Sequence, residues 1–234
     1  RNAGVGCSYT TLISTAGRRV GQRSKMYIPP YFKIEDPDAI ERIVSENGFA
    51  TLITPSSDGI KATHLPLLYA PPGSSEDAGT INGHMARAND HWKAFDAIAE
   101  SLAIFQGPDS YISPEWYETA PAVPTWNFAV VHMRGALELI DDREWLSSHV
   151  DDMVRFHESK ALDHSPEPSD PAFKAKLLGG IVGFRMKVKT IEAKFKLNQN
   201  RSKADRARVA EVLDRSGDQS AAGIAALMRT HGDE

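Results

Sequence analysis

The stretch that decides the fold is residues 49–69, which have the sequence FATLITPSSDGIKATHLPLLY. Apolar and β-branched residues are frequent from Phe49 to Thr54 and again from Ile60 to Tyr69, as in strands that are partly buried. Ser57-Asp58-Gly59 between them has the composition of a tight turn. Two strands joined by so short a turn are typical of an antiparallel β-hairpin.

Further strands and helices extend from this hairpin in both directions. We expect strands at Thr80 to Met85, Ser101 to Gln106, Thr125 to Ile140 and Ile181 to Leu197, with a loop at Gly107 to Asp109 and a bulge or bend at Gly135. We expect helices after caps at Asp36, at Asn89 or Asp90 and at Asp141 or Asp142, and over Ala172 to Leu178, Lys203 to Arg215 and Ala221 to Thr230. Helices and strands do not alternate regularly, and the glycine motifs of Rossmann and P-loop proteins are absent. The pattern predicts an α+β protein built on an antiparallel sheet or barrel.

The composition excludes several classes of protein. Of the 234 residues, 41% are hydrophobic and 25% are charged, as in ordinary globular proteins. The longest apolar runs are far shorter than the roughly 20 residues that a membrane span needs, so we expect no membrane protein. Cys7 is the only cysteine, so no intrachain disulfide and no cysteine-based zinc site can form. Neither a His-Glu-x-x-His motif nor a nucleophile elbow is present, and we expect no metal site.

The charge is unevenly distributed along the chain. Residues 1–25 carry five basic residues and no acidic one. Removing these five from the 27 basic residues leaves 22 basic against 31 acidic residues, a formal charge of −9 for the body. A body this acidic repels nucleic acid unless its cations are gathered on one face, so direct DNA binding is only weakly supported.

The first 25 residues look like a separate segment. They are rich in Ser, Thr, Gly and Arg and have no helical or strand periodicity. An organellar targeting peptide has this composition, and so does an extension ahead of a start at Met26. We favour the second interpretation and expect residues 1–25 to be unstructured or non-native. Leu12 and Ile13 are too short an apolar run for a secretory signal, and we expect a cytoplasmic protein.

Residues 83–92, GHMARANDHW, are the most suggestive stretch for ligand binding. A strand ends here, and the helix predicted after Asn89 or Asp90 would carry four apolar residues between Trp92 and Ala99 on one face. Free N–H groups at such a helix start, with the Arg87 guanidinium just ahead, would bind a phosphate or carboxylate. The alternative is that Arg87 is a solvated surface residue and Asn89 only a helix cap.

A proline interrupts an otherwise good strand at Thr63-His64-Leu65-Pro66. Proline cannot donate to a ladder, so it marks an edge, a bulge or a place where strand pairing is vacated. A flat polar ring could use that vacancy by bonding to the neighbouring backbone and the Thr63 hydroxyl. The alternative is an edge strand in which His64 finds a local partner.

Two further clusters have both a functional and a structural interpretation. Aromatic and polar residues crowd 106–117 and 121–132, which suits a pocket wall, a subunit interface or a small satellite core. Strand 181–197 carries Arg185, Lys187 and Lys189 on one face, with Lys194 and Lys196 further on. This alternation fits a guarded sheet edge, a bound anion or nucleic-acid contact.

A series of motifs runs in order from residue 26 to about residue 212. They are MYIPPYF (26–32), THLPL (63–67), GHMARAN (83–89) with Trp92, FQGP (105–108), YISP (111–114), WY (116–117), VPTWNF (123–128), VH (131–132), KLNQNR (196–201) and DR (205–206). Together they resemble the PaiB-type FMN-binding negative transcriptional regulators, and their number and order make the resemblance specific. Asp90 stands where the family tends to proline, and Asn198 where it tends to serine.

The resemblance implies a split β-barrel like that of pyridoxamine-phosphate oxidase, with peripheral and C-terminal helices, in a homodimer that holds FMN between its subunits. By motif position, Arg87, Ala88 and Asn89 would lie at the FMN phosphate and Thr63, His64 and Leu65 along the isoalloxazine. Gln106, Trp126 and Asn127 would complete the pocket. We accordingly expect a barrel domain over residues 26–200 and a helical segment packed on it over residues 201–234.

Three functions follow from these observations. The family implies a regulatory protein in which FMN is a sensor or a structural ligand. The alternative is a flavin-dependent oxidoreductase of the pyridoxamine-phosphate-oxidase or flavin-reductase type, because a flavin supplies the hydride chemistry itself; whether the protein is an enzyme stays open. Haem is a fainter third alternative, since some split barrels bind it and His84, His132 and His164 could be axial ligands.

Overall fold

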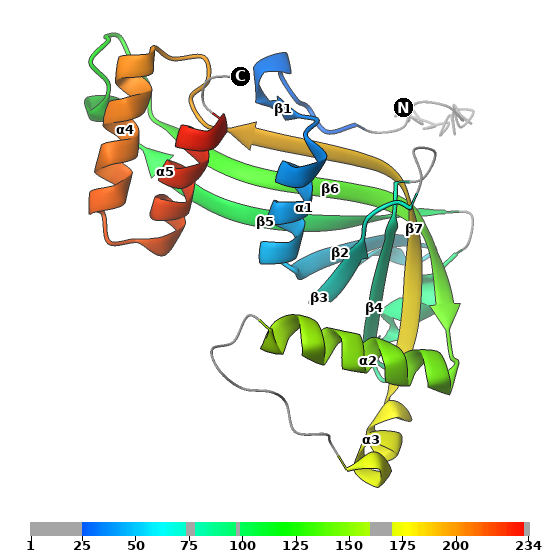
Figure 1. The fold of residues 1–234 in the computed structure, drawn as a ribbon. Coiled ribbons are helices and arrows are strands. Elements are labelled where there is room, and N and C mark those ends of the chain that lie inside the picture. Colours follow the sequence, from blue (N-terminus) through cyan, green and yellow to red (C-terminus); the bar gives the residue numbers. More distant parts are fainter. Residues whose placement is uncertain (1–24, 74–77, 97–98, 160–169, 232–234) are drawn as a thin grey trace, which may run out of the picture.

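The computed structural model describes residues 25–73, 78–96, 99–159 and 170–231 (Figure 1). Residues 1–24 and His164 lie outside these ranges. The strands are β1 (Lys33–Ile34), β2 (Phe49–Ser56), β3 (Gly59–Ala70), β4 (Thr80–Ala86), β5 (Glu100–Ile112), β6 (Thr125–Ile140) and β7 (Ile181–Lys196). The α-helices are α1 (Pro37–Glu46), α2 (Arg143–Glu158), α3 (Pro171–Leu178), α4 (Lys203–Arg215) and α5 (Gln219–His231), and the 3₁₀ helices are η1 (Pro30–Phe32), η2 (Asp90–Ala94) and η3 (Pro114–Trp116).

The described strands form one antiparallel barrel. Their order is β1-β7-β4-β3-β2-β5-β6, and β6 also pairs with β7, which closes six strands into a ring with β1 beside β7. The long strands β5, β6 and β7 run towards α4 and α5 at one end of the molecule, while α2 and α3 lie at the other (Figure 1). This topology confirms the predicted α+β fold built on an antiparallel barrel.

The hydrophobic core fills the barrel. Alternate residues of each strand point inward, as the two-residue period of a strand requires. Leu52, Phe105, Met133, Phe184 and Phe195 are each 0% exposed. Removing such side chains from water supplies roughly 25 cal/mol per Å² of apolar surface, so this interior is the main source of stability.

Helices cover the barrel and close its openings. In α1, which packs against β5 and β6, Asp36 caps the first turn by accepting a hydrogen bond from Asp38 N at 3.1 Å, as predicted. The helix turns Ile43 and Val44 inward, each 2% exposed. Helix α5 packs against β5 and β6 in the same way and also against α4.

The decisive hairpin forms as predicted. Strands β2 and β3 pair in the register Ala50↔Leu65 and Leu52↔Thr63, and the turn between them ends at Gly59. The backbone of Gly59 has φ +127°, a conformation that residues with a side chain rarely adopt, so glycine is required there.

Strand β3 has an unpaired edge in its first half. Its pairing with β2 runs from Ser56↔Gly59 to Phe49↔Pro66, whereas β4 pairs with it only from Leu67↔Gly83 onward. The side of residues 60–66 that would face β4 therefore has no strand partner in the described part of the chain. Pro66 lies where the second ladder begins, so the predicted vacancy is present, although β3 is a central strand.

The helix predicted after Asn89 is wrong in length and type. Asn89 does cap a helical turn, with Oδ1 accepting from His91 N at 3.0 Å, but the turn is the 3₁₀ helix η2 and ends at Ala94. Phe95 then adopts an extended conformation, and its ring packs edge-on against Phe184 at 5.3 Å between centroids. This core contact outweighs the local preference for a longer helix, so no helix dipole of useful length points at Arg87.

The loop predicted at Gly107 to Asp109 is also wrong, because β5 continues through it to Ile112. The register with β6 shifts between Gln106 and Asp109, which accommodates the missing N–H of Pro108. Ser220 on α5 stabilises the backbone at this register shift. Its hydroxyl oxygen lies 2.9 Å from Asp109 N and 2.8 Å from Asp109 O.

The basic strand 181–197 is not an edge strand, since β7 pairs with β6 on one side and, except at residues 189–192, with β4 and β1 on the other. That alternative is therefore wrong. The predicted irregularity at Gly135 is confirmed by a register shift between Arg134 and Gly135. A Cβ at Gly135 would lie 2.1 Å from the carbonyl oxygen of Lys187, so the close approach of the two strands requires glycine.

Candidate functional site

Three polar side chains meet at the unpaired edge of β3, where η2 packs against it. The Thr63 hydroxyl lies 2.7 Å from His91 Nδ1, and Asn89 Nδ2 donates to the same hydroxyl oxygen at 3.2 Å. The β-hairpin supplies Thr63, while the cap and first turn of η2 supply Asn89 and His91. Two residues of the predicted site, Thr63 and Asn89, are thus brought together.

His91 is the buried member of this cluster. The Thr63 hydroxyl accepts from the Asn89 amide and also hydrogen-bonds to His91 Nδ1, which leaves Nε2 as the second ring nitrogen. His91 is 3% exposed, and its Nε2 has no hydrogen-bond partner among the described residues. Burial lowers the pKa of His91, and the positive charge of Lys61 lowers that pKa further. The ring is therefore a neutral, buried imidazole beside an unpaired strand edge.

Lys61 brings a positive charge to this cluster and was not predicted. It lies two residues before Thr63 on the same face of β3, and its Nζ is 3.5 Å from Asp58 Oδ2. The pKa of Asp90 is lowered first by the hydrogen bond and charge of Lys93 and then, less strongly, by the charge of Lys61. The two-residue spacing of Lys61 and Thr63 was the sequence signal that could have found it.

Arg87 is bound to a different part of the molecule. Its guanidinium pairs with Asp141 at 2.5 Å and donates to the carbonyl oxygens of Ile181 at 3.0 Å and Gly179 at 3.3 Å. Arg87 thereby fastens the end of β4 to the turn between α3 and β7. Its side chain is 41% exposed, so one side of the guanidinium still faces solvent. The neighbouring Ala88 is exposed.

His64 and Leu65 point to opposite faces of β3. Leu65 is 4% exposed and belongs to the barrel core. His64 is on the outer face, where its Nδ1 lies 2.9 Å from Thr51 Oγ1 and its ring stacks on Phe49 with 6.5 Å between centroids. Phe49 is 72% exposed, so the apolar ring beside His64 lies open to solvent.

Gln106, Trp126 and Asn127 do not join the Thr63 cluster within one chain. Gln106 is exposed and donates to Asp109 Oδ2 at 3.3 Å, and Trp126 is 54% exposed with its ring edge-on to Tyr111. Asn127 is 0% exposed and points under α5, with Nδ2 3.6 Å from Met228 Sδ. Its Oδ1 has no partner among the described residues.

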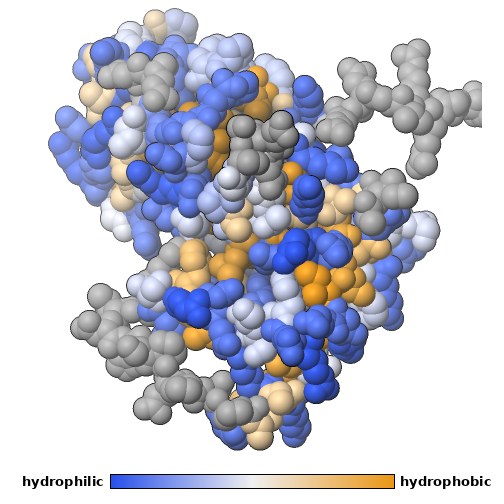
Figure 2. Space-filling view, turned by 45° about the vertical axis from the view of Figure 1, so that its right-hand side comes forward, coloured by the Kyte–Doolittle hydropathy of each residue, from blue (hydrophilic) through white to orange (hydrophobic). Residues whose placement is uncertain are grey.

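One exposed face of the barrel carries three of the predicted residues. We define the outer face as the side chains of Phe49, His64, Ile104, Gln106, Trp126 and Phe128, which alternate along β2, β3, β5 and β6 with the inward ones. In Figure 2, apolar surface gathers at mid-height, between the end that carries α4 and α5 and the end that carries α2 and α3. The exposed side chains of Phe49 and Trp126 give the outer face more apolar surface than is usual where a protein contacts only water.

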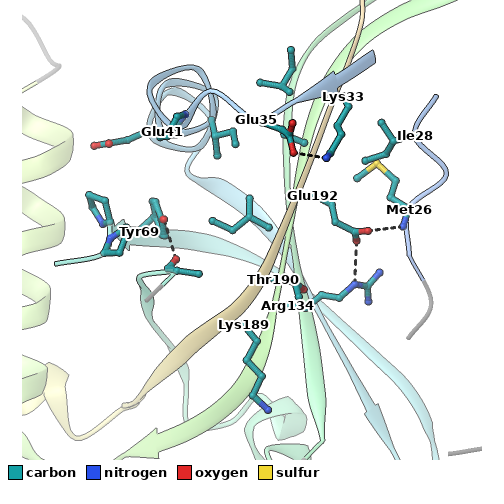
Figure 3. A pocket seen from close by; sticks show the side chains of 18 of the residues that line it. Met26, Ile28, Lys33, Glu35, Glu41, Tyr69, Arg134, Lys189, Thr190 and Glu192 are labelled. Atoms are coloured by element: carbon teal, nitrogen blue, oxygen red, sulfur yellow. Dashed lines mark hydrogen bonds and ion pairs between the residues drawn. The ribbon is translucent and has the colours of Figure 1, made fainter. Parts of the chain in front are cut away.

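A cavity of about 700 Å³ lies elsewhere, between α1, β1, β7 and the residues around Met26 (Figure 3). None of the nine predicted site residues lines it. Within the described ranges, no group of three or more His, Cys, Asp or Glu residues is placed to hold a metal ion. No helix in those ranges is both long and apolar enough to cross a membrane.

The antiparallel barrel, with helices at both ends and an unpaired strand edge beside a polar cluster, defines a split-barrel protein. Residues 26–190 match the family described as "Putative FMN-binding domain". The chain belongs to this family, and FMN is the family's cofactor.

The relatives agree with this assignment. The chain is 38% identical over 208 residues to protease synthase and sporulation protein PAI 2 of Bacillus subtilis, which covers 87% of this chain and 96% of that protein. This similarity confirms the resemblance to the PaiB type. The flavocytochrome Anf3 from Azotobacter vinelandii aligns with a TM-score of 0.51 at 16% identity, over 72% of each chain. A conserved hypothetical protein from Mycobacterium tuberculosis aligns with a TM-score of 0.50 at 13% identity, over 73% of this chain and 90% of that one. These two structures support the fold alone.

Proposed function

We propose that the chain is a cytoplasmic, FMN-binding regulatory protein of the PaiB type, which holds the flavin between two copies of itself. The observation that carries this proposal is the unpaired edge of β3 beside the Thr63–Asn89–His91 cluster. The proposed flavin contacts are Thr63, His64, Leu65, Arg87, Ala88, Asn89, Gln106, Trp126 and Asn127. The side chains of Leu65 and Asn127 are buried, so these two residues would contribute main-chain atoms.

The edge of β3 suits the ring of FMN. An isoalloxazine has polar atoms along its rim and apolar faces, so it needs donors and acceptors in one plane. Unpaired main-chain groups on the open side of residues 60–66 supply such a row, because an unpaired strand edge presents donors and acceptors to whatever lies beside it. His91 Nε2, a buried ring nitrogen without a partner in the described chain, adds a directed contact. Bound FMN supplies hydride and electron transfer, while the chain's residues bind and orient it.

Two cations could hold the phosphate. Lys61 Nζ lies 3.5 Å from Asp58 Oδ2, and the Asp58 side chain is 72% exposed. The positive charge of Lys61 is therefore weakly compensated. Arg87 already pairs with Asp141 and would have to share its guanidinium between the carboxylate and the phosphate. A guanidinium carries five donors, which makes sharing possible on its exposed side.

A second copy explains why the predicted residues fall into two groups. Thr63 and Asn89 meet at η2, whereas Gln106 and Trp126 lie along β5 and β6 on the outer face. In a twofold dimer each surface patch meets its counterpart, so the β6 residues of one copy can complete the flavin site of the other. The exposure of Phe49 and Trp126, 72% and 54%, gives that interface an apolar centre.

The test is to purify the protein, record its absorbance spectrum, identify the released ligand by mass and measure its mass in solution by light scattering. A flavin spectrum, FMN by mass and two chains per particle support the proposal. A single chain that binds FMN tightly contradicts the shared site. A Soret band would identify haem instead.

The regulatory role is tested separately from flavin binding. Anaerobic bleaching of the flavin by NADH or NADPH would favour the oxidoreductase alternative, and a spectrum unchanged by either supports a regulatory or structural flavin. Titration with promoter duplex at rising salt tests direct DNA contact, because phosphate contacts weaken steeply with salt. The acidic body predicts that any repression acts without tight direct DNA binding.

A further inference from the structure

Strand β7 has a gap in its pairing on the side opposite β6. Strand β4 pairs with it up to Thr80↔Lys187, and β1 begins only at Ile34↔Ala193. Val188 N still donates to Gly79 O at 3.0 Å, so the gap covers residues 189–192. An unpaired stretch of strand inside a barrel wall presents main-chain donors and acceptors to whatever lies beside it.

The cavity of about 700 Å³ opens onto this gap. Its walls are largely apolar, with Ile28, Ile40, Tyr69 and Ile191 among the lining side chains. In Figure 3, Met26 and Ile28 lie on one side of β7, and Tyr69 and Glu41 on the other, so the cavity borders both sides of the strand. Cavities of this size hold small organic molecules.

The polar part of the wall is a pair of opposite charges. Arg134 Nε and Glu192 Oε2 are 3.5 Å apart, with side chains 22% and 16% exposed. Both atoms are buried, and neither makes a hydrogen bond within the described residues. Glu192 Oε1 accepts from Met26 N at 3.0 Å (Figure 3). The part of each side chain that stays exposed leaves one cationic and one anionic group able to take a further partner.

The other charges around the cavity leave it balanced. Lys33 pairs with Glu35, Lys189 lies 3.9 Å from Glu100, and Lys25 and Glu41 add one charge of each sign. A strongly cationic or anionic ligand therefore finds no excess of opposite charge. A molecule with both an anionic and a cationic end finds both partners at Arg134 and Glu192.

We propose that this cavity binds a short zwitterionic peptide or amino acid with apolar side chains. Its carboxylate would take the Arg134 guanidinium, its ammonium group the Glu192 carboxylate, and its peptide groups the unpaired edge of β7 at residues 189–192. Strand addition of this kind uses main-chain hydrogen bonds for affinity and apolar pockets for side-chain preference. The site is separate from the proposed flavin contacts and goes beyond the proposed function.

The test is calorimetric titration with the dipeptide Leu-Leu and with its capped analogue, acetyl-Leu-Leu-amide. The free dipeptide should bind saturably, and the capped form should bind at least tenfold more weakly because it lacks both charges. Arg134→Gln and Glu192→Gln should each weaken Leu-Leu by about 10- to 100-fold, the range for a lost charge-assisted hydrogen bond. Lys187→Gln, an exposed change on the same strand, is the matched control and should leave the affinity unchanged.

A third variant, Ile40→Trp, fills the cavity and keeps both charges, so it should abolish binding even if a charge variant folds poorly. Absence of saturable Leu-Leu binding to the wild-type protein overturns the proposal, as does equal affinity for the free and capped peptides. The titrations are run with and without FMN. Peptide binding in a protein that takes up no FMN removes the proposed flavin site and keeps this one, and the reverse result does the opposite.

Discussion

Arg87 is the residue for which sequence and structure suggest different roles, and its replacement separates them. Arg87→Ala removes a pair with Asp141 at 2.5 Å and a hydrogen bond to Ile181 O at 3.0 Å. The two charged side chains are 41% and 60% exposed, so solvent screening limits the pair to about 0.2–1 kcal/mol. The bond to the carbonyl adds about 0.5–1.5 kcal/mol. We therefore expect Arg87→Ala to lower the free energy of unfolding by about 1–2 kcal/mol, measured by urea denaturation.

A role of Arg87 in phosphate binding predicts a second effect of the same variant, on the affinity for FMN. If Arg87 binds the FMN phosphate, Arg87→Ala should weaken FMN by about 1.5–3 kcal/mol, which is roughly 10- to 100-fold. Riboflavin lacks the phosphate and should be nearly unaffected. The assay is quenching of flavin fluorescence on titration with protein, and the measured quantity is the ratio of the FMN and riboflavin affinities.

Asp141→Ala is the matched control, because it frees Arg87 without removing it. In that variant the preference for FMN over riboflavin should stay the same or increase, while stability falls by about 0.2–1 kcal/mol. Lys61→Ala tests the other candidate cation in the same assay. If Arg87→Ala retains the full preference for FMN and Lys61→Ala loses it, Arg87 is a structural residue and the phosphate assignment from motif position is refuted.

Three further predictions concern stability. Gly135→Ala should destabilise the protein by about 2 kcal/mol or more in urea, because its Cβ would lie 2.1 Å from a backbone carbonyl oxygen of β7, whereas Gly73→Ala, with nothing within 4 Å of its Cβ, should not. Asp205→Ala should cost about 1–3 kcal/mol by leaving Glu118 N without its 2.7 Å acceptor. Hydrogen bonds, first from Thr119, lower the pKa of Asp205 in the folded protein. Its contribution to stability is therefore complete above the unfolded pKa near 3.9 and is lost as the pH falls through the folded pKa. An unchanged acid unfolding midpoint in Asp205→Ala would contradict this. Burial, with a smaller effect of the charge of His84, lowers the pKa of His149 to about 4. Because the unfolded ring takes up its proton near pH 6.5, the stability of the protein should decrease between pH 6.5 and pH 4 by up to about 3 kcal/mol. In thermal melts, His149→Gln should make stability depend less on pH over this range.

Much of the fold could be predicted from local rules in the sequence. The bounds expected for β6, Thr125–Ile140, and for α4, Lys203–Arg215, are those observed. Both segments combine a clear periodicity with an unambiguous start, such as the Ser202 cap of α4. Where a segment's own residues supply its caps and its buried face, the local preference and the tertiary structure agree.

The errors occurred where a distant contact decided the local structure. Phe95 left the predicted helix because its ring packs against Phe184, 89 positions away along the chain. Pro108 stayed within β5 because Ser220 on α5 bonds both backbone groups of Asp109. Neither partner is visible from the residues around the break, so no local rule could have predicted these outcomes.

By itself the sequence indicated an antiparallel sheet or barrel and an edge, bulge or vacated pairing at Pro66, because strand period and turn composition are properties of neighbouring residues. The order of its motifs gave the resemblance to the family and, through it, the flavin cofactor. Only the tertiary structure decided that Arg87 pairs with Asp141, that Asn127 is buried under α5, and that Lys61 and His91 stand at the vacant edge of β3. A site is made of side chains from separate elements, and their distances and charges exist only once the barrel has closed around its core.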